Sequence, residues 1–163
     1  GLGAPPFPPT PPSVVVGVPP EWEAQVLLCR RAIEPRHELW TLPAGFIENG
    51  ETLAAGAVRE TIEEARARVD VGELYTVISL PQISQVYVMF RSRLLDLDFG
   101  PGPESLEVRL FHEDEIPWDR IAFRTIARTL RTFFLDRRDG AFPLHVSALE
   151  RRARLEPDLS GAA

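Results

Sequence analysis

Short apolar runs alternate with turn-like segments over the first third of the chain. The runs SVVVGV (13–18) and AQVLLCR (24–30) are β-branched or aliphatic and predict two β-strands, and the segment PPEWE between them predicts a turn. The stretch 32–51 is interrupted by prolines and glycines and predicts a long loop. The ordered part of the chain is therefore expected to begin with strands.

From Thr52 onward the apolar residues recur at helical spacing. Thr52 is a suitable N-cap, and one apolar face follows it. This face consists of Leu53, Ala54, Ala57, Val58, Ile62 and Ala65. Arg59, Glu60, Glu63 and Glu64 are expected to project away from it. The pattern predicts an amphipathic helix with one strongly charged side.

The second half of the chain returns to strands and then to a helix. Three strands are predicted, over 69–81, 85–95 and 108–113, with a glycine- and proline-rich loop at 96–107. A second helix is predicted over 121–137, because apolar residues recur there at helical spacing and a glycine follows the basic end.

This order of elements predicts an α/β fold in which a mixed β-sheet lies between helices. The chain has no G-x-G-x-x-G motif that would favour a Rossmann unit. Its 163 residues, 44% of them hydrophobic, are enough to bury one core. We expect one domain over 14–149, preceded by a proline-rich arm at 1–13 and followed by a flexible tail at 150–163.

The charged residues exclude several classes of protein. All 18 positively charged residues are arginine, so a Schiff-base lysine and a Walker-type lysine are absent. The formal net charge of -6 argues against a nucleic-acid partner, because non-specific binding to nucleic acids depends on basic patches. A small anionic substrate is still compatible with this charge if arginine or a metal ion assists its binding.

Cysteine and histidine offer no metal cage. Cys29 is the single cysteine and lies in an apolar run, so we expect a buried hydrophobic residue and exclude an internal disulfide and a thiolate zinc site. His37, His112 and His145 show no metal-ligand spacing. No apolar run reaches the roughly 18 residues of a membrane span, and no signal-peptide pattern occurs, so we predict a cytoplasmic protein without a membrane partner.

The first predicted helix carries three glutamates within five residues. Since residues three and four apart are neighbours on a helix, Glu60 meets Glu63 and Glu64, and Arg59 meets Glu63. If the single arginine orients one carboxylate, Glu60 and Glu64 are left without a cation. A Mg²⁺ or Mn²⁺ ion would compensate, because hard divalent cations take carboxylate, water and phosphate oxygens. The alternative interpretation is an acidic helix face exposed to solvent.

The spacing of this cluster and of the loop before it resembles the signature of the Nudix hydrolases, G-x5-E-x7-R-E-U-x-E-E. The residues that match are Gly45, Glu51, Arg59, Glu60, Glu63 and Glu64. The resemblance implies a Nudix-type α/β/α sandwich. It also implies that Glu60, Glu63, Glu64 and the carbonyl of Ala44 hold metal ions, that Arg59 orients a glutamate, and that Gly45 and Glu51 are structural.

The signature ends differently in this chain. Where the family pattern has a glycine after the helix, the chain has Arg66. A non-glycine residue in a left-handed C-cap costs about 1 kcal/mol, so we expect the helix to continue through RARV (66–69). Arg66 and Arg68 would then lie near the negative end of the helix dipole, which favours them.

Over 14–149 the chain is similar to the Nudix subgroup that hydrolyses ADP-ribose and FAD. This resemblance implies metal-dependent hydrolysis of a pyrophosphate bond with release of AMP, and a homodimer. The general base is left open among Glu63, Glu104 and Glu107. The zinc ribbon that many members of the subgroup carry would need more cysteines than the one present.

The substrate-binding candidates are aromatic or arginine residues on segments that can border the site. For adenine they are Arg31, Trp40, Phe46 and Tyr87, and for phosphate they are Arg30, Arg31 and Arg36. Two other functions stay open. One is the hydrolysis of modified nucleoside triphosphates with release of pyrophosphate, and the other is a non-catalytic nucleotide-binding module, although such a module is expected to lose the metal glutamates that this chain retains.

Overall fold

Nine β-strands, two α-helices and three short 3-10 helices form the part of the chain that the computed structural model describes, residues 12–150. The strands are β1 (Ser13–Gly17), β2 (Pro20–Trp22), β3 (Gln25–Arg31), β4 (Trp40–Thr41), β5 (Ala44–Phe46), β6 (Val69–Leu80), β7 (Gln85–Leu94), β8 (Ser105–Phe111) and β9 (His145–Ala148). The α-helices are α1 (Leu53–Ala65) and α2 (Arg124–Asp139). Apart from residues 12, 13 and 150, the predicted arm and tail lie outside the described residues.

The strands form one mixed sheet, as the sequence predicted. β7 lies between β6, which is antiparallel to it, and the pair β1 and β2, which both run parallel to it. β3 pairs antiparallel with β2, β4 and β8. β5 pairs with β1, and β9 extends the other side of the sheet by running parallel to β6.

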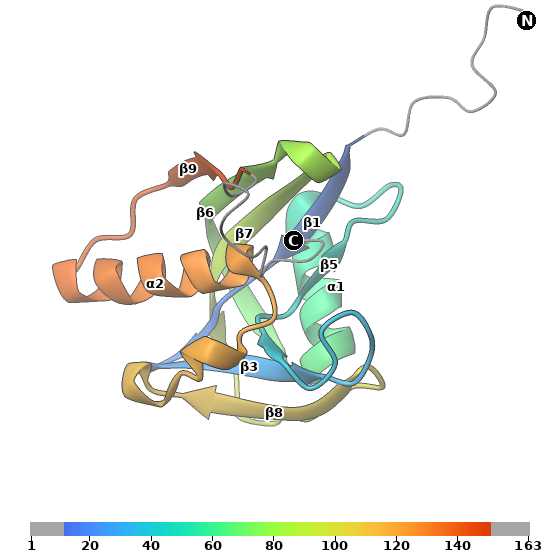
Figure 1. The fold of residues 1–163 in the computed structure, drawn as a ribbon. Helices are drawn as coiled ribbons and strands as arrows, with labels where there is room; N and C mark the ends of the chain where they lie inside the picture. Colours follow the sequence, from blue (N-terminus) through green and yellow to red (C-terminus); the bar gives the residue numbers. More distant parts are fainter. Residues whose placement is uncertain (1–11, 151–163) are drawn as a thin grey trace, which may run out of the picture.

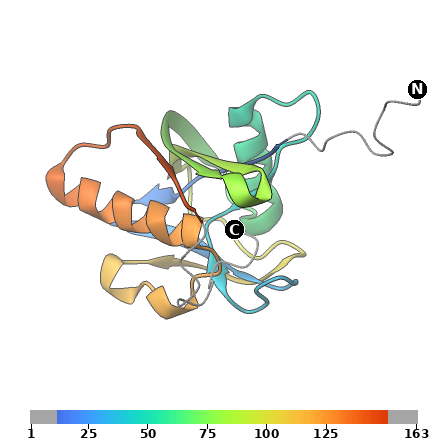
Figure 2. The ribbon, with the colours of Figure 1, turned by 45° about the horizontal axis from the view of Figure 1, so that its top comes forward.

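The helices α1 and α2 cover opposite faces of this sheet (Figures 1 and 2). In β1, Val15 packs in the cluster that contains α2, whereas Val16 packs with Ala57 of α1. In β3, Leu28 joins the α2 cluster and Leu27 joins Ala65 of α1. Because successive side chains of a strand point to opposite faces, these alternations confirm the predicted α/β/α sandwich.

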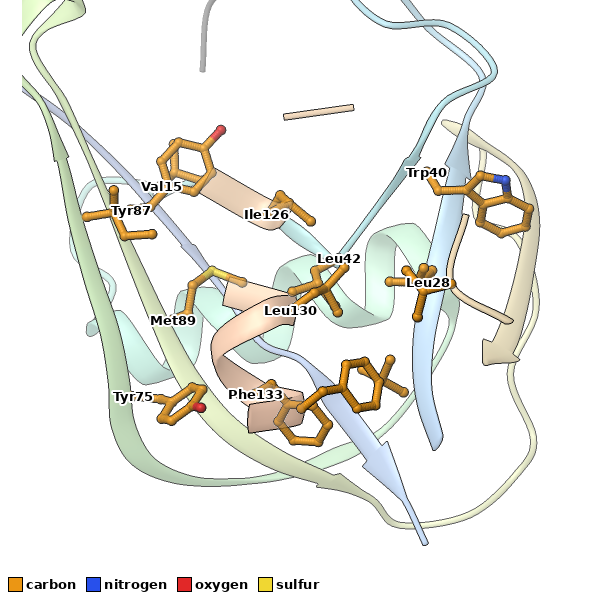
Figure 3. Packing of buried hydrophobic residues seen from close by; sticks show 14 of the residues in the cluster. Val15, Leu28, Trp40, Leu42, Tyr75, Tyr87, Met89, Ile126, Leu130 and Phe133 are labelled. Carbon is orange, nitrogen blue, oxygen red and sulfur yellow. The ribbon is translucent and has the colours of Figure 1, made fainter. Parts of the chain in front are cut away.

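The largest hydrophobic cluster surrounds α2. Ile126, Leu130 and Phe133 are fully buried. Figure 3 shows them between residues of β6 and β7 on one side and of β3 on the other. Burial of an aliphatic or aromatic side chain of this size contributes about 1.5–3 kcal/mol, so the position of α2 against the sheet is strongly determined.

A buried polar contact fixes the C-terminal end of α2. The Tyr75 hydroxyl of β6 donates to Asp136 Oδ2 at 2.6 Å, and His145 Nε2 of β9 lies 2.7 Å from the same oxygen. Burial and the Asp136 carboxylate raise the pKa of Tyr75. The contact joins β6, α2 and β9, so His145 has a structural role.

The long regular elements match their predictions closely, and the ends differ for identifiable reasons. The strands predicted at 69–81 and 85–95 are β6 and β7. α2 begins at Arg124 rather than at residue 121, because Ile121 forms a bridge with Trp40. Gly140 has a φ of 75° and ends α2, as predicted.

The short strands were predicted as turn or loop, or were not predicted. The segment PPEWE contains β2, and the predicted loop at 32–51 contains β4 and β5. These strands have two or three residues each, too few for a recognisable period, and they are strands because β3, β7 and β1 supply their hydrogen bonds. β8 likewise begins three residues before the predicted strand, where it pairs with β3.

The prediction that α1 continues through 66–69 is wrong. The helix ends at Ala65, and Arg66 takes the left-handed conformation, with φ 48° and ψ 31°. Its amide donates to the carbonyl of Ile62 at 2.9 Å, which is the hydrogen bond of the αL C-cap motif, and the amide of Ala67 donates to the carbonyl of Thr61 at 3.5 Å. The turn brings Ala67 into the core at 1% exposure, and this burial offsets the cost of the left-handed arginine.

The predicted apolar face of α1 is also partly wrong. Leu53 and Ile62 are exposed, whereas the buried side of the helix is formed by Gly56, Ala57, Glu60, Thr61 and Ala65. The helix is therefore rotated so that a glutamate faces inward. Burial of a carboxylate is unfavourable unless it has a partner, and Glu60 accepts a hydrogen bond from Arg59 of the same helix at 2.8 Å.

Candidate active site

Arg59 of α1 is the centre of an ion-pair network. Its Nε and Nη2 donate to the two carboxylate oxygens of Glu51 at 2.6 and 2.9 Å, a bidentate contact. Its Nη1 lies 2.8 Å from Glu60 Oε1, 3.2 Å from Glu63 Oε2 and 3.5 Å from Glu48 Oε1. The network joins the loop before α1 to the charged side of the helix.

The expectation that one arginine orients one carboxylate is therefore wrong. A guanidinium has five N–H donors, and Arg59 uses them on several carboxylates and on the carbonyl of Phe46, at 3.1 Å. The contact with Arg59 lowers the pKa of Glu51 to about 2, and Glu51 in turn raises the pKa of Arg59. Glu51 also accepts from the amide of Glu48 at 2.8 Å, which closes the loop. These contacts agree with the structural role predicted for Glu51.

Glu60 and Glu64 form a pair of inward-facing carboxyl groups one helical turn apart. Glu60 is 8% exposed, and its carboxyl group is within hydrogen-bonding reach of that of Glu64. Burial, followed by the neighbouring Glu60, raises the pKa of Glu64, whereas the backbone of Ala44 and the charge of Arg31 lower it. Arg59 contacts Glu51, Glu60 and Glu63 and does not contact Glu64. Glu64 is therefore the carboxylate most in need of a cation.

Gly45 is the residue that allows Glu60 to lie there. A Cβ at position 45 would be 2.3 Å from Glu60 Oε2 and 2.5 Å from Oε1. Any side chain at this position would therefore displace the carboxylate. β5 thus presents the backbone of Ala44 to Glu64 and the bare α-carbon of Gly45 to Glu60.

These oxygens fit a hard divalent cation. Two adjacent carboxylates and backbone carbonyl oxygens, completed by water and substrate phosphate, are the usual environment of Mg²⁺ or Mn²⁺. Among residues 12–150 no three acidic, histidine or cysteine side chains converge closely enough to form a complete protein cage. Glu63 is turned towards Arg59 and is mostly exposed, so Glu60 and Glu64 are the two carboxylates that the structure brings together.

The loop between β7 and β8 docks on the C-terminal end of α1. The amides of Gly100 and Gly102 donate to the carbonyls of Ala65 and Glu64 at 2.9 and 3.1 Å, and Ser105 Oγ donates to the latter at 2.8 Å. A Cβ on Gly102 would lie 1.7 Å from the carbonyl oxygen of Glu63. The close approach therefore requires glycine, and the free carbonyls of the helix end are satisfied by this loop.

The two loop glutamates proposed as general base lie in different places. Glu104 follows Gly102 in the docked loop and is exposed. Glu107 pairs with Arg30 across β8 and β3 and lies 4.0 Å from its Nε. The next pair of residues, Cys29 and Val108, packs against α1, so Glu107 points to the opposite face of the sheet.

Arg31 and Tyr87 lie on the α2 side of the carboxylate pair. Both are close to Glu64: the charge of Arg31 lowers the pKa of Glu64, and the charge of Glu64 raises the pKa of Tyr87. The Arg31 guanidinium is 5.0 Å from the centre of the Phe123 ring, and its Nε donates to the carbonyl of Pro35 at 2.8 Å. Burial raises the pKa of Tyr87, which faces Thr125 at the start of α2.

The other substrate-binding candidates are scattered. Trp40 is buried and packs edge-on against Phe111 at 5.0 Å, which makes it a core residue. Phe46 is the last residue of β5 and is 55% exposed. Arg36 is half-buried in the hairpin between β3 and β4. The structure therefore brings Arg31 and Tyr87, and not Trp40, to the inner side of the site.

Sequence reasoning missed three contributors to the site. Glu48 joins the Arg59 network, Gly102 anchors the docked loop, and Phe123 supports Arg31. The only sequence signal for any of them was the glycine between two prolines, Pro101 and Pro103, which indicated an unusual backbone.

Comparisons with known proteins identify relatives of this chain. A family model described as the NUDIX domain matches residues 11–133. A NUDIX hydrolase of known structure from Nitrosomonas europaea is 58% identical, with a TM-score of 0.86, over 87% of this chain and 81% of its own.

Two curated relatives are more distant. A MutT-like protein of Streptomyces ambofaciens is 31% identical over 129 residues, which are 79% of this chain and 78% of that protein. An ADP-ribose pyrophosphatase of Methanocaldococcus jannaschii is 28% identical over 116 residues, 69% of this chain and 68% of that protein. Within residues 12–150, no helix is both long enough and apolar enough to cross a membrane.

Proposed function

The chain belongs to the Nudix hydrolase family, and from this membership we propose that it hydrolyses the pyrophosphate bond of ADP-ribose or FAD with release of AMP. A Nudix pyrophosphohydrolase is the class of enzyme that the family and its relatives support. The relative from Methanocaldococcus jannaschii, an ADP-ribose pyrophosphatase, supports the substrate.

One observation carries the proposal: Glu60 and Glu64 face each other inside the protein, and only Glu60 has a guanidinium partner. Two neighbouring like charges, one buried and one partly buried, are unfavourable without a cation, so the pair would hold Mg²⁺ or Mn²⁺ together with the carbonyl of Ala44. When bound, such an ion neutralises charge on the phosphate oxygens and helps to orient water. Arg59 holds Glu60 in place from the other side, since its Nη1 lies 2.8 Å from Glu60 Oε1.

The reaction needs a base for the attacking water. The water oxygen forms a bond to one phosphorus, the bond from that phosphorus to the bridging oxygen breaks, and the base takes the proton. We propose Glu104 as this base, because its loop is docked on the end of α1 and the Glu104 side chain is exposed to solvent. Glu63 is the second candidate, although its carboxylate is engaged by Arg59 at 3.2 Å. Glu107 is the third candidate, and its carboxylate lies 4.0 Å from Arg30 Nε.

Arg31 is the proposed phosphate ligand of the chain itself. It lies between Glu64 and the aromatic ring of Phe123, so its guanidinium can donate to a diphosphate whose other oxygens face the carboxylate pair. Tyr87 and Phe46 are proposed to border the nucleotide. A homodimer and a cytoplasmic location stay predictions.

A substrate screen tests the function directly. Purified protein is incubated with ADP-ribose, FAD, NADH and nucleoside triphosphates, each with Mg²⁺ and with Mn²⁺, and the products are separated. AMP from ADP-ribose or FAD is the expected result. Pyrophosphate from a triphosphate would instead identify the modified-nucleotide hydrolase, and no product from any substrate would leave the non-catalytic nucleotide-binding module.

The Glu64→Gln variant tests the carboxylate pair. It keeps the size of the side chain and removes the charge, so turnover should fall about a hundredfold or more while the melting temperature stays within a few degrees. Glu73→Gln, at an exposed position on β6, is the matched control and should keep full activity. Activity of Glu64→Gln close to that of the control would refute the metal assignment.

A further inference from the structure

Thr125, the second residue of α2, carries a buried hydroxyl without a hydrogen-bond partner. The residue is fully buried, and within the described part of the chain no donor or acceptor has hydrogen-bonding geometry with its Oγ1. The other buried threonines of that part all use their hydroxyls in hydrogen bonds: they are Thr41, Thr61, Thr76 and Thr129. A buried hydroxyl without a partner is unfavourable, and valine would fill the same space without it. Packing therefore does not account for the Thr125 hydroxyl.

This hydroxyl faces Tyr87 of β7. Burial raises the pKa of Tyr87, and the nearby Thr125 hydroxyl lowers it. A lower pKa is the effect of a donor near the phenol oxygen, because such a donor stabilises the phenolate. The two oxygens are nevertheless outside the geometry of a hydrogen bond. The two side chains are thus close to a hydrogen bond that the protein does not complete by itself.

The Tyr87 hydroxyl lies beside the proposed active site. The charge of Arg31 lowers the pKa of Tyr87 and the charge of Glu64 raises it, so the hydroxyl is close to the proposed phosphate ligand and to the carboxylate pair. The strand register agrees with this position. Tyr87 pairs with Val15 of β1, and Val15 pairs with Phe46 at the end of β5, the strand that contacts the carboxylates.

The second tyrosine of the chain has a different arrangement. Tyr75 lies at the opposite end of the hydrophobic cluster (Figure 3), and its hydroxyl donates to Asp136 at 2.6 Å. Thr125 is the single side chain within hydrogen-bonding reach of the Tyr87 hydroxyl in residues 12–150, and no carboxylate there takes its proton. The proton of Tyr75 is therefore used inside the fold, whereas the proton of Tyr87 is available to a ligand.

We propose that the Tyr87 hydroxyl donates to a non-bridging oxygen of the substrate diphosphate, and that Thr125 is the positioning residue behind it. The Thr125 hydroxyl donates to the Tyr87 oxygen, which directs the phenol proton towards the substrate and makes it a stronger donor. A phosphate oxygen is the matching acceptor, because it is anionic and Arg31 favours an anion at the same place. The inference rests on the proposed function for the presence of a diphosphate, and it assigns Tyr87 to the phosphate rather than to the adenine ring.

Thermal unfolding tests whether the Thr125 hydroxyl stabilises the fold. Thr125→Val removes a hydroxyl that has no partner, so the melting temperature should stay unchanged or rise. Thr129→Val is the matched control, one turn further along α2 and also fully buried. The Thr129 hydroxyl donates to the Thr125 carbonyl at 2.9 Å and lies 3.3 Å from Thr76 Oγ1, so its loss should lower the melting temperature by about 2–4 °C. An equal decrease in Thr125→Val would overturn the proposal, because the hydroxyl would then be structural.

Binding of inorganic pyrophosphate tests the contact without turnover of a nucleotide. Pyrophosphate carries the diphosphate group that the candidate substrates share, and calorimetry in the presence of Mg²⁺ measures its affinity. Tyr87→Phe should weaken binding about tenfold, the effect of one lost hydrogen bond to a charged group. Thr125→Val should weaken it about threefold, because the phenol is still present but no longer oriented. Thr129→Val should bind like the wild type. Equal affinities of the wild type and Tyr87→Phe, or no binding to the wild type, would overturn the proposal.

A double-mutant cycle tests whether Thr125 acts through Tyr87. When the phenol is absent in Tyr87→Phe, the addition of Thr125→Val should weaken binding no further, and Thr125→Ser, which keeps the hydroxyl, should bind like the wild type. Additive losses in the double variant, or a Thr125→Ser variant as weak as Thr125→Val, would overturn the positioning role. In turnover, the variants should lower kcat/KM in the same order. If the wild type binds pyrophosphate but hydrolyses no nucleotide, the proposed function fails, and the differences in affinity still decide the roles of both residues.

Discussion

Replacing Arg66 by glycine should give a more stable protein than replacing it by alanine, because of the backbone conformation at the end of α1. Arg66 has φ 48° at the end of α1, in the left-handed region that glycine adopts without a steric penalty. Its side chain is exposed. The substitution therefore acts mainly on the backbone.

The magnitude follows from a comparison with alanine at the same position. A residue with a Cβ pays about 1.5 kcal/mol in the left-handed conformation. Glycine gains freedom in the unfolded chain that costs about 0.7 kcal/mol. Arg66→Gly should therefore be about 0.8 kcal/mol more stable than Arg66→Ala, and both variants lose the same favourable interaction of the arginine with the helix dipole.

Thermal and urea unfolding measure this difference. For a chain of this size, about 0.8 kcal/mol corresponds to a melting temperature about 2 to 3 °C higher for Arg66→Gly than for Arg66→Ala. Arg68 provides the matched control: it is two residues further on, exposed, and does not have a positive φ. There the order should reverse, with Arg68→Gly less stable than Arg68→Ala. If glycine is no better than alanine at position 66, the helix does not end in the left-handed turn described.

Three further substitutions probe the network and the docked loop. Glu51 has a pKa of about 2 in the folded protein against an ordinary 4.5, so its contribution to stability is complete above about pH 4.5 and is lost as the pH falls towards 2. Glu51→Gln should therefore flatten the dependence of the melting temperature on pH between these values. An unchanged profile would contradict the Arg59 contact. Gly102→Ala should lower the melting temperature by several degrees because its Cβ would clash with the backbone of α1, whereas Gly100→Ala, which meets open space, should not. Glu104→Gln should slow hydrolysis by more than tenfold, and a smaller effect would remove Glu104 as the base.

The sequence was most informative where the relevant contacts are local. The spacing from Glu60 to Glu64 places two carboxyl groups one turn apart on any helix, so their proximity could be predicted. The rotation of that helix could not, because it depends on the fit of Glu60 against Gly45, fifteen residues earlier. The strongest apolar candidates, Leu53 and Ile62, are consequently exposed.

Contacts between distant segments account for the remaining differences. Glu104 and Glu107 are equivalent in the sequence, but the pairing of β8 with β3 sends Glu107 to the face away from α1. A shift of one residue in this register would exchange the faces. Trp40 was predicted to stack on adenine, but it packs against Phe111 in the core.

The docking of Gly102 on the last turn of α1 couples the helix that carries Glu60 and Glu64 to the loop between β7 and β8. Without this contact, the two segments could vary separately among homologues. The residues from Gly100 to Ser105 bind the last carbonyl groups of α1. A loop transplanted from a relative must therefore keep the glycine and the serine hydroxyl, because without them the end of the helix beside Glu64 would fray. Engineering of substrate range by loop exchange should therefore cut after Ser105 or before Leu95, and not between these anchors.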